Sequence, residues 1–326
     1  MSDSFGRSFP YIRLSITDVC NFKCGYCLPN GYFKAENKPG FLNLDEISNL
    51  VAAFTKLGVS KIRITGGEPT VRKDFFEVLR NIKSEHKINN LVITTNGYKL
   101  NEIAEELIAT GINGINISID SLDRNKFKEI TGKDRLPQIL EGINILQNKG
   151  FKNIKVNAVL LKNVNDSLEE FQNWERFINN NEIDFRYIEL MQTGDNLEYF
   201  KKYHISASNF RKYIESTDWK EISQIRDAGP SINYVHSKLK GKFGIIAPYS
   251  KDFCITCNRL RITAKGELRL CLFGNTGANL RPYLQNQNQK DELVELILKQ
   301  LRFKKESHYL ETGNTGITPH LASIGG

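Results

Sequence analysis

Short apolar runs alternate with longer amphipathic segments along the chain up to residue 190. The short runs are rich in the apolar residues of buried strands, and the longer segments space their apolar residues near 3.6, which is typical of helices packed on a sheet. Strands are predicted at 11–17, 61–67, 90–97, 114–120, 154–162 and 184–190, with helices at 44–58, 73–85, 101–111, 136–150 and 167–181.

This regular alternation indicates six β/α units in series. Such a series requires a parallel sheet with right-handed crossover connections. It is compatible with an open barrel and with a doubly wound sheet. In both folds ligands bind at the carboxyl ends of the strands, so the chemistry is expected in the loops that follow them.

The alternation ends after residue 192, and residues 193–240 look polar and irregular. Beyond the break a helix near 208–216, short strands at 242–248 and 268–273, and a helix at 291–305 are predicted. The glycine-rich tail, 311–326, is expected to be flexible. We therefore expect a catalytic part, 1–192, and a C-terminal part, 193–326.

Composition and charge exclude several classes of protein. The chain is 40% hydrophobic and 25% charged, which is ordinary for a globular protein. Its first residues lack the apolar core of a signal peptide, and no run approaches the roughly 18 apolar residues of a membrane span. We expect a cytoplasmic protein without membrane association. The net charge of +8 favours an anionic partner, but the basic residues are too dispersed to indicate nucleic acid.

Six cysteines fall into two groups of three, with none left over. The first group is Cys20, Cys24 and Cys27, and the second is Cys254, Cys257 and Cys271. In a cytosolic protein such grouping indicates metal rather than disulfides. Structural zinc needs four ligands, whereas a four-iron cluster held by three cysteines leaves one iron open for a small molecule. The count of three therefore favours an iron–sulfur cluster at each group.

Zinc is the alternative at both groups, with histidine or aspartate as the fourth ligand. No histidine is close in sequence to either group. Asp18, beside the first group, is a poor partner for a site of soft ligands. The iron–sulfur interpretation is therefore preferred, and the zinc interpretation stays open.

Basic residues interrupt strands that should be almost continuously apolar in a closed parallel sheet. They are Arg13, Lys61, Arg63, Lys155 and Arg186, and the C-terminal segment adds Arg259 and Arg261. Lys61 and Arg63 are two residues apart and share one face of their strand. If that face points inward, the cations form a ring, and because buried unpaired charge is costly, the ring predicts a polyanion such as a triphosphate. Lys162 is an alternative to Lys155.

The spacing Cys-x3-Cys-x2-Cys after a first strand, with Tyr26 before the third cysteine, resembles the radical S-adenosylmethionine superfamily. In that family the open iron binds S-adenosylmethionine, which one electron splits into methionine and a 5′-deoxyadenosyl radical. The resemblance implies an incomplete (β/α)6 TIM-like barrel whose open side is closed by the C-terminal iron–sulfur segment. It also implies cofactor contacts from Tyr26, Gly66, Gly67, Glu68, Ser118 and Met191.

The whole chain resembles, more narrowly, the GTP 3′,8-cyclase family of molybdenum-cofactor biosynthesis. Shared stretches include "KIRITGGEPTVR", "RYIELM", "CNRLR" and the final Gly325-Gly326. The resemblance implies a second [4Fe-4S] cluster on the second cysteine group, with its open iron on the guanine base. It implies GTP contacts from Arg13, Lys61, Arg63, Thr94, Lys155, Arg186, Arg259, Leu260 and Arg261.

The implied activity converts GTP and S-adenosylmethionine into (8S)-3′,8-cyclo-7,8-dihydroguanosine 5′-triphosphate, 5′-deoxyadenosine and methionine. The resemblance implies catalytic roles for Arg63, Gly325 and Gly326. It also implies an external electron donor, cyclic pyranopterin monophosphate synthase as the downstream enzyme, and a homodimer. Two other interpretations stay open, namely a radical enzyme that matures peptides and a zinc-stabilised module that binds nucleic acid.

Overall fold

The computed structural model describes residues 1–33, 40–223, 229–274, 277–313 and 315–325. Its centre is a 12-stranded sheet in the order β12-β11-β10-β1-β2-β3-β4-β5-β6-β9-β8-β7. The strands are β1 (Tyr11–Ser15), β2 (Lys61–Thr65), β3 (Asn90–Thr95), β4 (Gly114–Ser118), β5 (Ile154–Leu160), β6 (Asp184–Glu189), β7 (Trp219–Ile222), β8 (Ile232–His236), β9 (Lys242–Ile246), β10 (Arg259–Ile262), β11 (Glu267–Arg269) and β12 (Gly277–Asn279). The α-helices are α1 (Leu44–Lys56), α2 (Phe75–Ser84), α3 (Leu100–Ala109), α4 (Arg124–Thr131), α5 (Leu136–Asn148), α6 (Leu168–Asn181), α7 (Leu197–Tyr203), α8 (Ala207–Glu215) and α9 (Lys290–Leu301).

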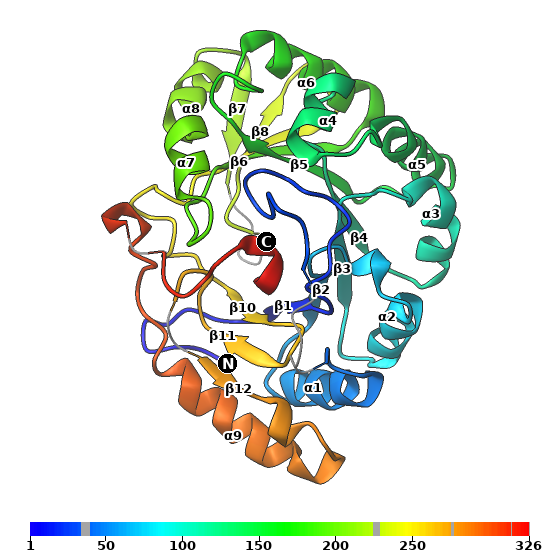
Figure 1. The fold of residues 1–326 in the computed structure, drawn as a ribbon, viewed down its shortest axis with the longest axis vertical. Helices are drawn as coiled ribbons and strands as arrows, with labels where there is room; N and C mark the ends of the chain where they lie inside the picture. Colours follow the sequence, from blue (N-terminus) through cyan, green and yellow to red (C-terminus); the bar gives the residue numbers. More distant parts are fainter. Residues whose placement is uncertain (34–39, 224–228, 275–276, 314, 326) are drawn as a thin grey trace.

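Strands β1 to β6 lie side by side in chain order and pair in parallel. Helices α1 to α6 follow the outer side of the curved sheet (Figure 1). A doubly wound sheet would reverse its strand order and carry helices on both faces, so this arrangement is the barrel-like alternative. The predicted six strands and five helices are confirmed, with shorter ends because the predicted segments ran into the loops.

The C-terminal segment extends both edges of this sheet. β10 pairs in parallel with β1, and β9 pairs in parallel with β6. Antiparallel strands β11 and β12 continue beyond β10, and β8 and β7 continue beyond β9. Within the described strands the two edges do not pair with each other, so the prediction of an incomplete barrel is confirmed.

Three expectations about the C-terminal part are wrong. The predicted helix near 208–216 is confirmed as α8, but the rest of 193–240 is not irregular, because α7 and the β7–β8 pair also lie there, with Trp219 and Tyr234 buried in the core. The strand expected at 268–273 ends at Arg269. The tail is not a free end, because the apolar side chains of Leu321 and Ile324 are buried.

Alternate residues of each strand face the helices and the barrel interior. Ile12 and Ile62 have no exposed surface and belong to the hydrophobic core, whereas Arg13, Lys61 and Arg63, at intervening positions, line an internal cavity. The polar interior explains why these strands are not continuously apolar.

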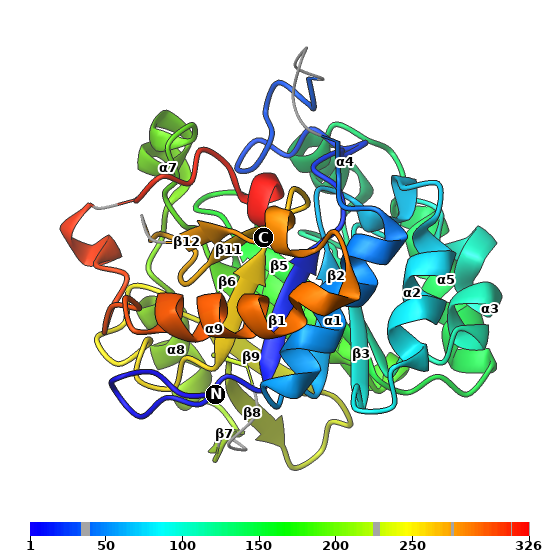
Figure 2. The same cartoon turned by 90° about the horizontal axis from the view of Figure 1, so that it is seen from below.

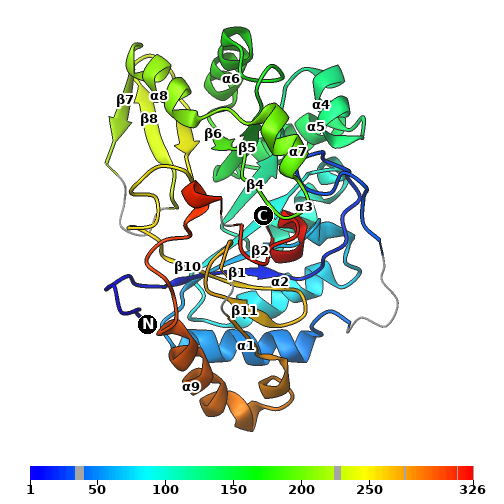
Figure 3. The same cartoon turned by 60° about the vertical axis from the view of Figure 1, so that its left-hand side comes forward.

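Figure 2 shows the C-terminus near one end of the strands and the N-terminus near the other, and Figure 3 shows α9 lying beside α1.

Among the described residues, no helix combines the length and apolar character that crossing a membrane requires.

Candidate active site

The first cysteine group lies in the loop after β1, at the carboxyl ends of the parallel strands. Burial raises the pKa of Cys20 to about 11. Burial and the neighbouring Cys20 raise the pKa of Cys27 to about 12, and burial with Asp120 raises that of Cys24 well above its usual value. Because the thiolate is the metal ligand, thiolates form here only when a cation compensates the charge.

The glycine pair after β2 packs against the backbone that leads to Cys20. The amide of Gly67 donates to the carbonyl of Thr17 at 2.9 Å, and that of Glu68 donates to the carbonyl of Val19 at 2.8 Å. A Cβ on Gly67 would lie 2.4 Å from the Val19 oxygen. Only glycine permits this approach, so the Gly66–Gly67 segment is placed next to the cysteine loop as predicted for a cofactor contact.

Glu68 is fully buried, and its carboxylate accepts four hydrogen bonds. Thr70 donates through its amide and its hydroxyl, at 3.1 and 2.6 Å, and the Thr95 hydroxyl donates at 2.7 Å. The amide of Asn96 donates to the second oxygen at 2.6 Å. Glu68 therefore joins the loops after β2 and β3, and its contact with a cofactor ammonium stays a prediction.

Two residues that sequence reasoning missed hold the predicted cofactor contacts in place. The Tyr26 hydroxyl donates to Asp120 at 3.0 Å, and burial raises the pKa of Asp120 to about 6. The side-chain amide of Asn196 donates to the carbonyls of Tyr26 at 3.1 Å and Met191 at 3.0 Å. Asp120 follows the end of β4 by two residues, and its nearness to the predicted contact Ser118 was its only sequence signal.

The C-terminal tail lies over the same end of the barrel. Backbone amides of Leu321 and Ala322 face the Cys27 thiol and lower its pKa, against the larger effect of burial. The carbonyl of Gly325 accepts a hydrogen bond from Arg261 at 3.4 Å. A Cβ on Gly325, whose φ is +71°, would lie 2.1 Å from Thr65. Gly326 lies outside the described residues.

The second cysteine group lies at the opposite end of the barrel. Cys254 and Cys257 precede β10, which is parallel to β1, and Cys271 follows β11, which is antiparallel to β10. All three therefore lie at the amino ends of the parallel strands, whereas Cys20 and its group lie at the carboxyl ends.

Cations surround the second group. Burial would raise the pKa of Cys257, but Lys304 and Arg259 outweigh burial and the net pKa is lowered. A histidine distant in sequence also lies here, since the backbone amide of His308 faces the Cys254 thiol. The His308 Nδ1 atom accepts a hydrogen bond from the Leu310 amide at 3.0 Å.

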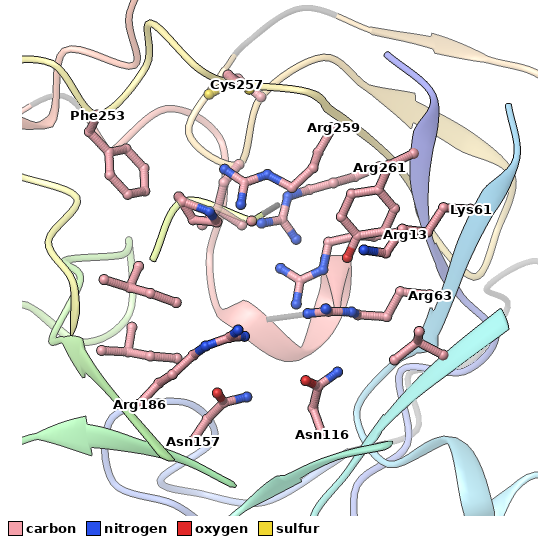
Figure 4. A pocket seen from close by; sticks show the side chains of 18 of the residues that line it. Arg13, Lys61, Arg63, Asn116, Asn157, Arg186, Phe253, Cys257, Arg259 and Arg261 are labelled. Atoms are coloured by element: carbon pink, nitrogen blue, oxygen red, sulfur yellow. The ribbon is translucent and has the colours of Figure 1, made fainter. Parts of the chain in front are cut away.

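A cavity of about 370 Å³ connects this end to the barrel interior (Figure 4). All three cysteines of the second group line it, together with Arg13, Lys61, Arg63, Lys155, Arg186, Arg259 and Arg261. The described lining contains no aspartate or glutamate. The expectation that the strand cations face inward together is therefore confirmed by their placement.

Three arginines stand in a row across adjacent strands, because Arg13 on β1 is in register with Arg261 on β10 and Arg63 on β2. Burial and Arg261 lower the pKa of Arg13 well below its usual value. Burial and Arg259 lower the pKa of Arg261 to about 10. The Nε atoms of Arg13 and Arg63 are buried without a hydrogen-bond partner. This concentration of buried positive charge is unfavourable unless an anion compensates it.

The other predicted contacts lie in different places. Lys155 lines the cavity and pairs with Asp184 at 2.7 Å, whereas Lys162 is exposed. The Thr94 hydroxyl is buried without a partner. Leu260 lies in the hydrophobic core and does not line the cavity, so its contact with GTP stays a prediction.

Two family models match the chain, "Radical SAM superfamily" over residues 14–174 and "Molybdenum Cofactor Synthesis C" over residues 183–310. The GTP 3′,8-cyclase of Stenotrophomonas maltophilia (strain K279a) is 49% identical over 326 residues, which cover 100% of this chain and 99% of the relative. The GTP 3′,8-cyclase of Shewanella denitrificans is 46% identical over 328 residues, covering 100% and 96%.

Among solved structures, Streptococcus suis SuiB bound to S-adenosylmethionine superposes with a TM-score of 0.65 at 17% identity, over 91% of this chain and 68% of that chain. This likeness supports the fold alone. The relatives confirm the resemblance inferred from the motifs. The chain belongs to the GTP 3′,8-cyclase family of the radical S-adenosylmethionine superfamily, a membership that implies a [4Fe-4S] cluster and S-adenosylmethionine.

Proposed function

We propose that this chain is a GTP 3′,8-cyclase, which converts GTP and S-adenosylmethionine into (8S)-3′,8-cyclo-7,8-dihydroguanosine 5′-triphosphate, 5′-deoxyadenosine and methionine. This is the first step of molybdenum-cofactor biosynthesis. The cation-lined cavity that reaches the second cysteine group is the observation that carries the proposal. A small polyanion with a metal-binding base fits such a cavity. A peptide substrate would not explain why so many cations line the cavity while its described lining contains no aspartate or glutamate.

The two cysteine groups each hold a [4Fe-4S] cluster in this proposal. Among the described residues no three His, Cys, Asp or Glu side chains are placed to hold a single metal ion. A mononuclear zinc site needs its donors around one ion, whereas a cubane binds each cysteine on a different iron. The first cluster follows from membership of the radical S-adenosylmethionine superfamily, and the second rests on the family resemblance and on the cavity.

The first cluster and S-adenosylmethionine, when bound, supply one-electron cleavage that makes a carbon radical at the carboxyl end of the barrel. The chain's own residues position the reactants. Tyr26, the Gly66–Gly67 segment and Met191 hold the cofactor, with Glu68 and Ser118 beside them.

At the substrate, the arginine row and Lys61 neutralise the triphosphate, and the second cysteine group orients the guanine towards the amino end. Only the ribose then lies between the two ends. There the C3′ hydrogen atom passes to the 5′-deoxyadenosyl radical, which becomes 5′-deoxyadenosine, and C3′ joins C8 of the base. One further electron from the external donor and a proton complete the 7,8-dihydro product. Holding both reactants supplies most of the rate gain, because such a radical step needs orientation and exclusion of water.

We place Arg63 and the Gly325–Gly326 tail in the catalytic machinery. Arg63 belongs to the arginine row, and Gly325 contacts Arg261 of the same row. The tail therefore spans from the Cys27 loop to the cavity, and it covers the space between cofactor and substrate. Gly325 lies so close to Thr65 that any larger residue at this position would collide with it, which supports a role specific to glycine.

The remaining proposals concern organisation and partners. We place the division between a radical part, 1–192, and a C-terminal part, 193–326, after β6, where the series of β/α units ends; the second family model begins earlier, at residue 183. The protein acts in the cytoplasm without nucleic acid or membrane, as a homodimer. An external donor supplies the electron, and cyclic pyranopterin monophosphate synthase takes up the product.

Anaerobic turnover tests the proposal. The protein is reconstituted with iron and sulfide, reduced with dithionite, and given S-adenosylmethionine with GTP, with ATP or without nucleotide. We expect 5′-deoxyadenosine release that depends on GTP, together with a cyclised guanosine triphosphate. Release that is indifferent to the nucleotide would keep the radical chemistry and remove GTP as the substrate. Total iron on the order of eight atoms per chain, rather than two zincs, is expected for two clusters.

A further inference from the structure

The side chains that face the barrel interior change from charged to uncharged along the strands. Arg13 and Arg63 are in register on β1 and β2, and two residues further towards the carboxyl end the register pairs Ser15 with Thr65. The same level continues on β3 and β4, where Thr94 is paired with Asn116. On β1 to β4 a level of uncharged hydroxyls and amides therefore separates the arginine row from the loop of the first cysteine group. On β5 the register continues with Lys155, whose charge is paired with Asp184 at 2.7 Å.

Asn116 presents an acceptor that the protein does not use. The residue is 1% exposed and lines the cavity. Its side-chain nitrogen donates to the carbonyl of Ile93 at 3.3 Å, which fixes the orientation of the amide. Its Oδ1 atom is then left buried without a hydrogen-bond partner, as is the neighbouring Thr94 hydroxyl. Burying such an atom is costly unless a ligand supplies a donor.

The chemistry of the ligand decides what that donor is. Ionised phosphates carry only acceptors, and the cations on β10, β1 and β2 already match them. Guanine N–H groups are assigned to the other end of the cavity, near Cys257 and Arg259. Figure 4 shows Asn116 and Asn157 across the cavity from Arg259 and Arg261. The donors left for this level are the hydroxyls of the ribose.

We propose that Asn116, together with Thr94, accepts hydrogen bonds from the ribose hydroxyls of the nucleotide and selects ribonucleoside over deoxyribonucleoside triphosphates. This inference rests on the proposed function and adds a specificity-determining residue to it. Asn157, whose Oδ1 is also buried without a partner, lies two residues further along, in register with Ser118 on β4 and Arg186 on β6, and adds a polar position towards the cofactor. The sugar is thereby fixed by its hydroxyls directly below the place where its C3′ hydrogen is removed.

Equilibrium binding of nucleotides to the reconstituted protein tests the inference without turnover. GTP, 2′-deoxyGTP and 3′-deoxyGTP are titrated anaerobically in the absence of reductant. We expect the wild type to bind at least one deoxynucleotide about tenfold more weakly than GTP, the loss expected for one buried acceptor left without its donor. The two deoxynucleotides show which hydroxyl is bound.

Variants show which residue is responsible. Asn116→Leu keeps the volume but removes the acceptor, so GTP affinity should fall about tenfold while the affinity for the sensitive deoxynucleotide stays the same. Asn116→Thr retains an oxygen and should keep part of the preference. Asn90→Ala is the matched control, because Asn90 lines the same cavity but is in register with Lys61 near the phosphates. It should leave the ratio of the affinities unchanged.

Equal binding of all three nucleotides by the wild type would overturn the inference without any variant. An Asn116→Leu protein that weakens all three nucleotides by the same factor would also overturn it. The proposed function fails separately, if the wild type binds no GTP or releases no 5′-deoxyadenosine with it. Iron content and circular dichroism show that each variant is folded and loaded.

Discussion

Replacing Arg261 by methionine should make the nucleotide-free protein more stable and its GTP binding weaker. Arg261 is 8% exposed and has no carboxylate partner in the described part of the chain. Its guanidinium stands beside Arg13, and its hydrogen bond to the Gly325 carbonyl is long at 3.4 Å. If Arg261 served only to stabilise the fold, its replacement would lower the stability of the protein. The sign of the stability change therefore separates a structural role from a role in binding an anion.

The pKa of Arg261 gives the magnitude. Burial and Arg259 lower it from 12.5 to about 10, which corresponds to roughly 3 kcal/mol against the charged form in the folded state. Because the folded-state pKa lies below the unfolded one, this penalty is complete below about pH 10 and fades only between about 10 and 12.5. Lost packing and the Gly325 contact offset part of it. We therefore expect a net gain of roughly 1–2 kcal/mol at neutral pH, or a few degrees in Tm.

Anaerobic thermal unfolding with and without GTP measures both effects. Loss of one charge-assisted contact to phosphate should weaken GTP binding by roughly 10- to 100-fold, so GTP should raise the Tm of the variant less than that of the wild type. Arg281→Met is the matched control, because Arg281 is paired with the buried Glu46 at 2.7 Å. It should lower the Tm by stranding that carboxylate and leave GTP affinity unchanged. A lower Tm for the nucleotide-free Arg261→Met protein would refute the argument that this cation is held at a cost for an anion.

Three further predictions concern the clusters and the tail. Cys24→Ser should lose about four irons and all cleavage of S-adenosylmethionine while still binding GTP, as iron analysis and nucleotide titration will show; retained cleavage would contradict its assignment. Cys257→Ser should also lose about four irons but keep cleavage that no longer depends on GTP, and an unchanged iron content would remove the second cluster. Gly325→Ala should reduce product formation at least about tenfold with GTP affinity retained, because its Cβ would lie 2.1 Å from Thr65; normal turnover would show that the tail moves aside.

The parallel core of the fold was predictable because its signals are local. Each β/α unit carries its own periodicity, and helix α1 even shows its start, where Asn43 and Glu46 form a capping box. The cysteine count was likewise enough to predict an open cluster after β1. Helix α4 was missed because it is short and charged. β7 and β8 were missed because they are short and depend on long-range pairing, β8 with β9 and the edge strand β7 with β8.

The site was predictable only where the spacing of residues along one strand indicates which face their side chains occupy. Lys61 and Arg63 share a face by their spacing, but nothing local indicates that Arg261 will stand in the same row. That register depends on β10 pairing with β1 across most of the chain length. Asn116 gave no signal at all, because an asparagine in a strand is informative only when its free oxygen is known to face a cavity.

The pairing of β10 with β1 also explains why the two cysteine groups have different surroundings. A strand added in parallel at the edge places the residues before it at the amino ends, so Cys257 is brought among cations on the far side of the arginine row from Cys20. The nucleotide must then extend from one end of the barrel towards the other. Its charged and base-binding ends are held by residues of fixed charge, and only the uncharged level at Thr94 and Asn116 faces the place where the radical forms. Lys155 is in register with Asn116, but its charge is paired with Asp184 at 2.7 Å, so it attracts the triphosphate less than the arginine row does and leaves this level to the sugar.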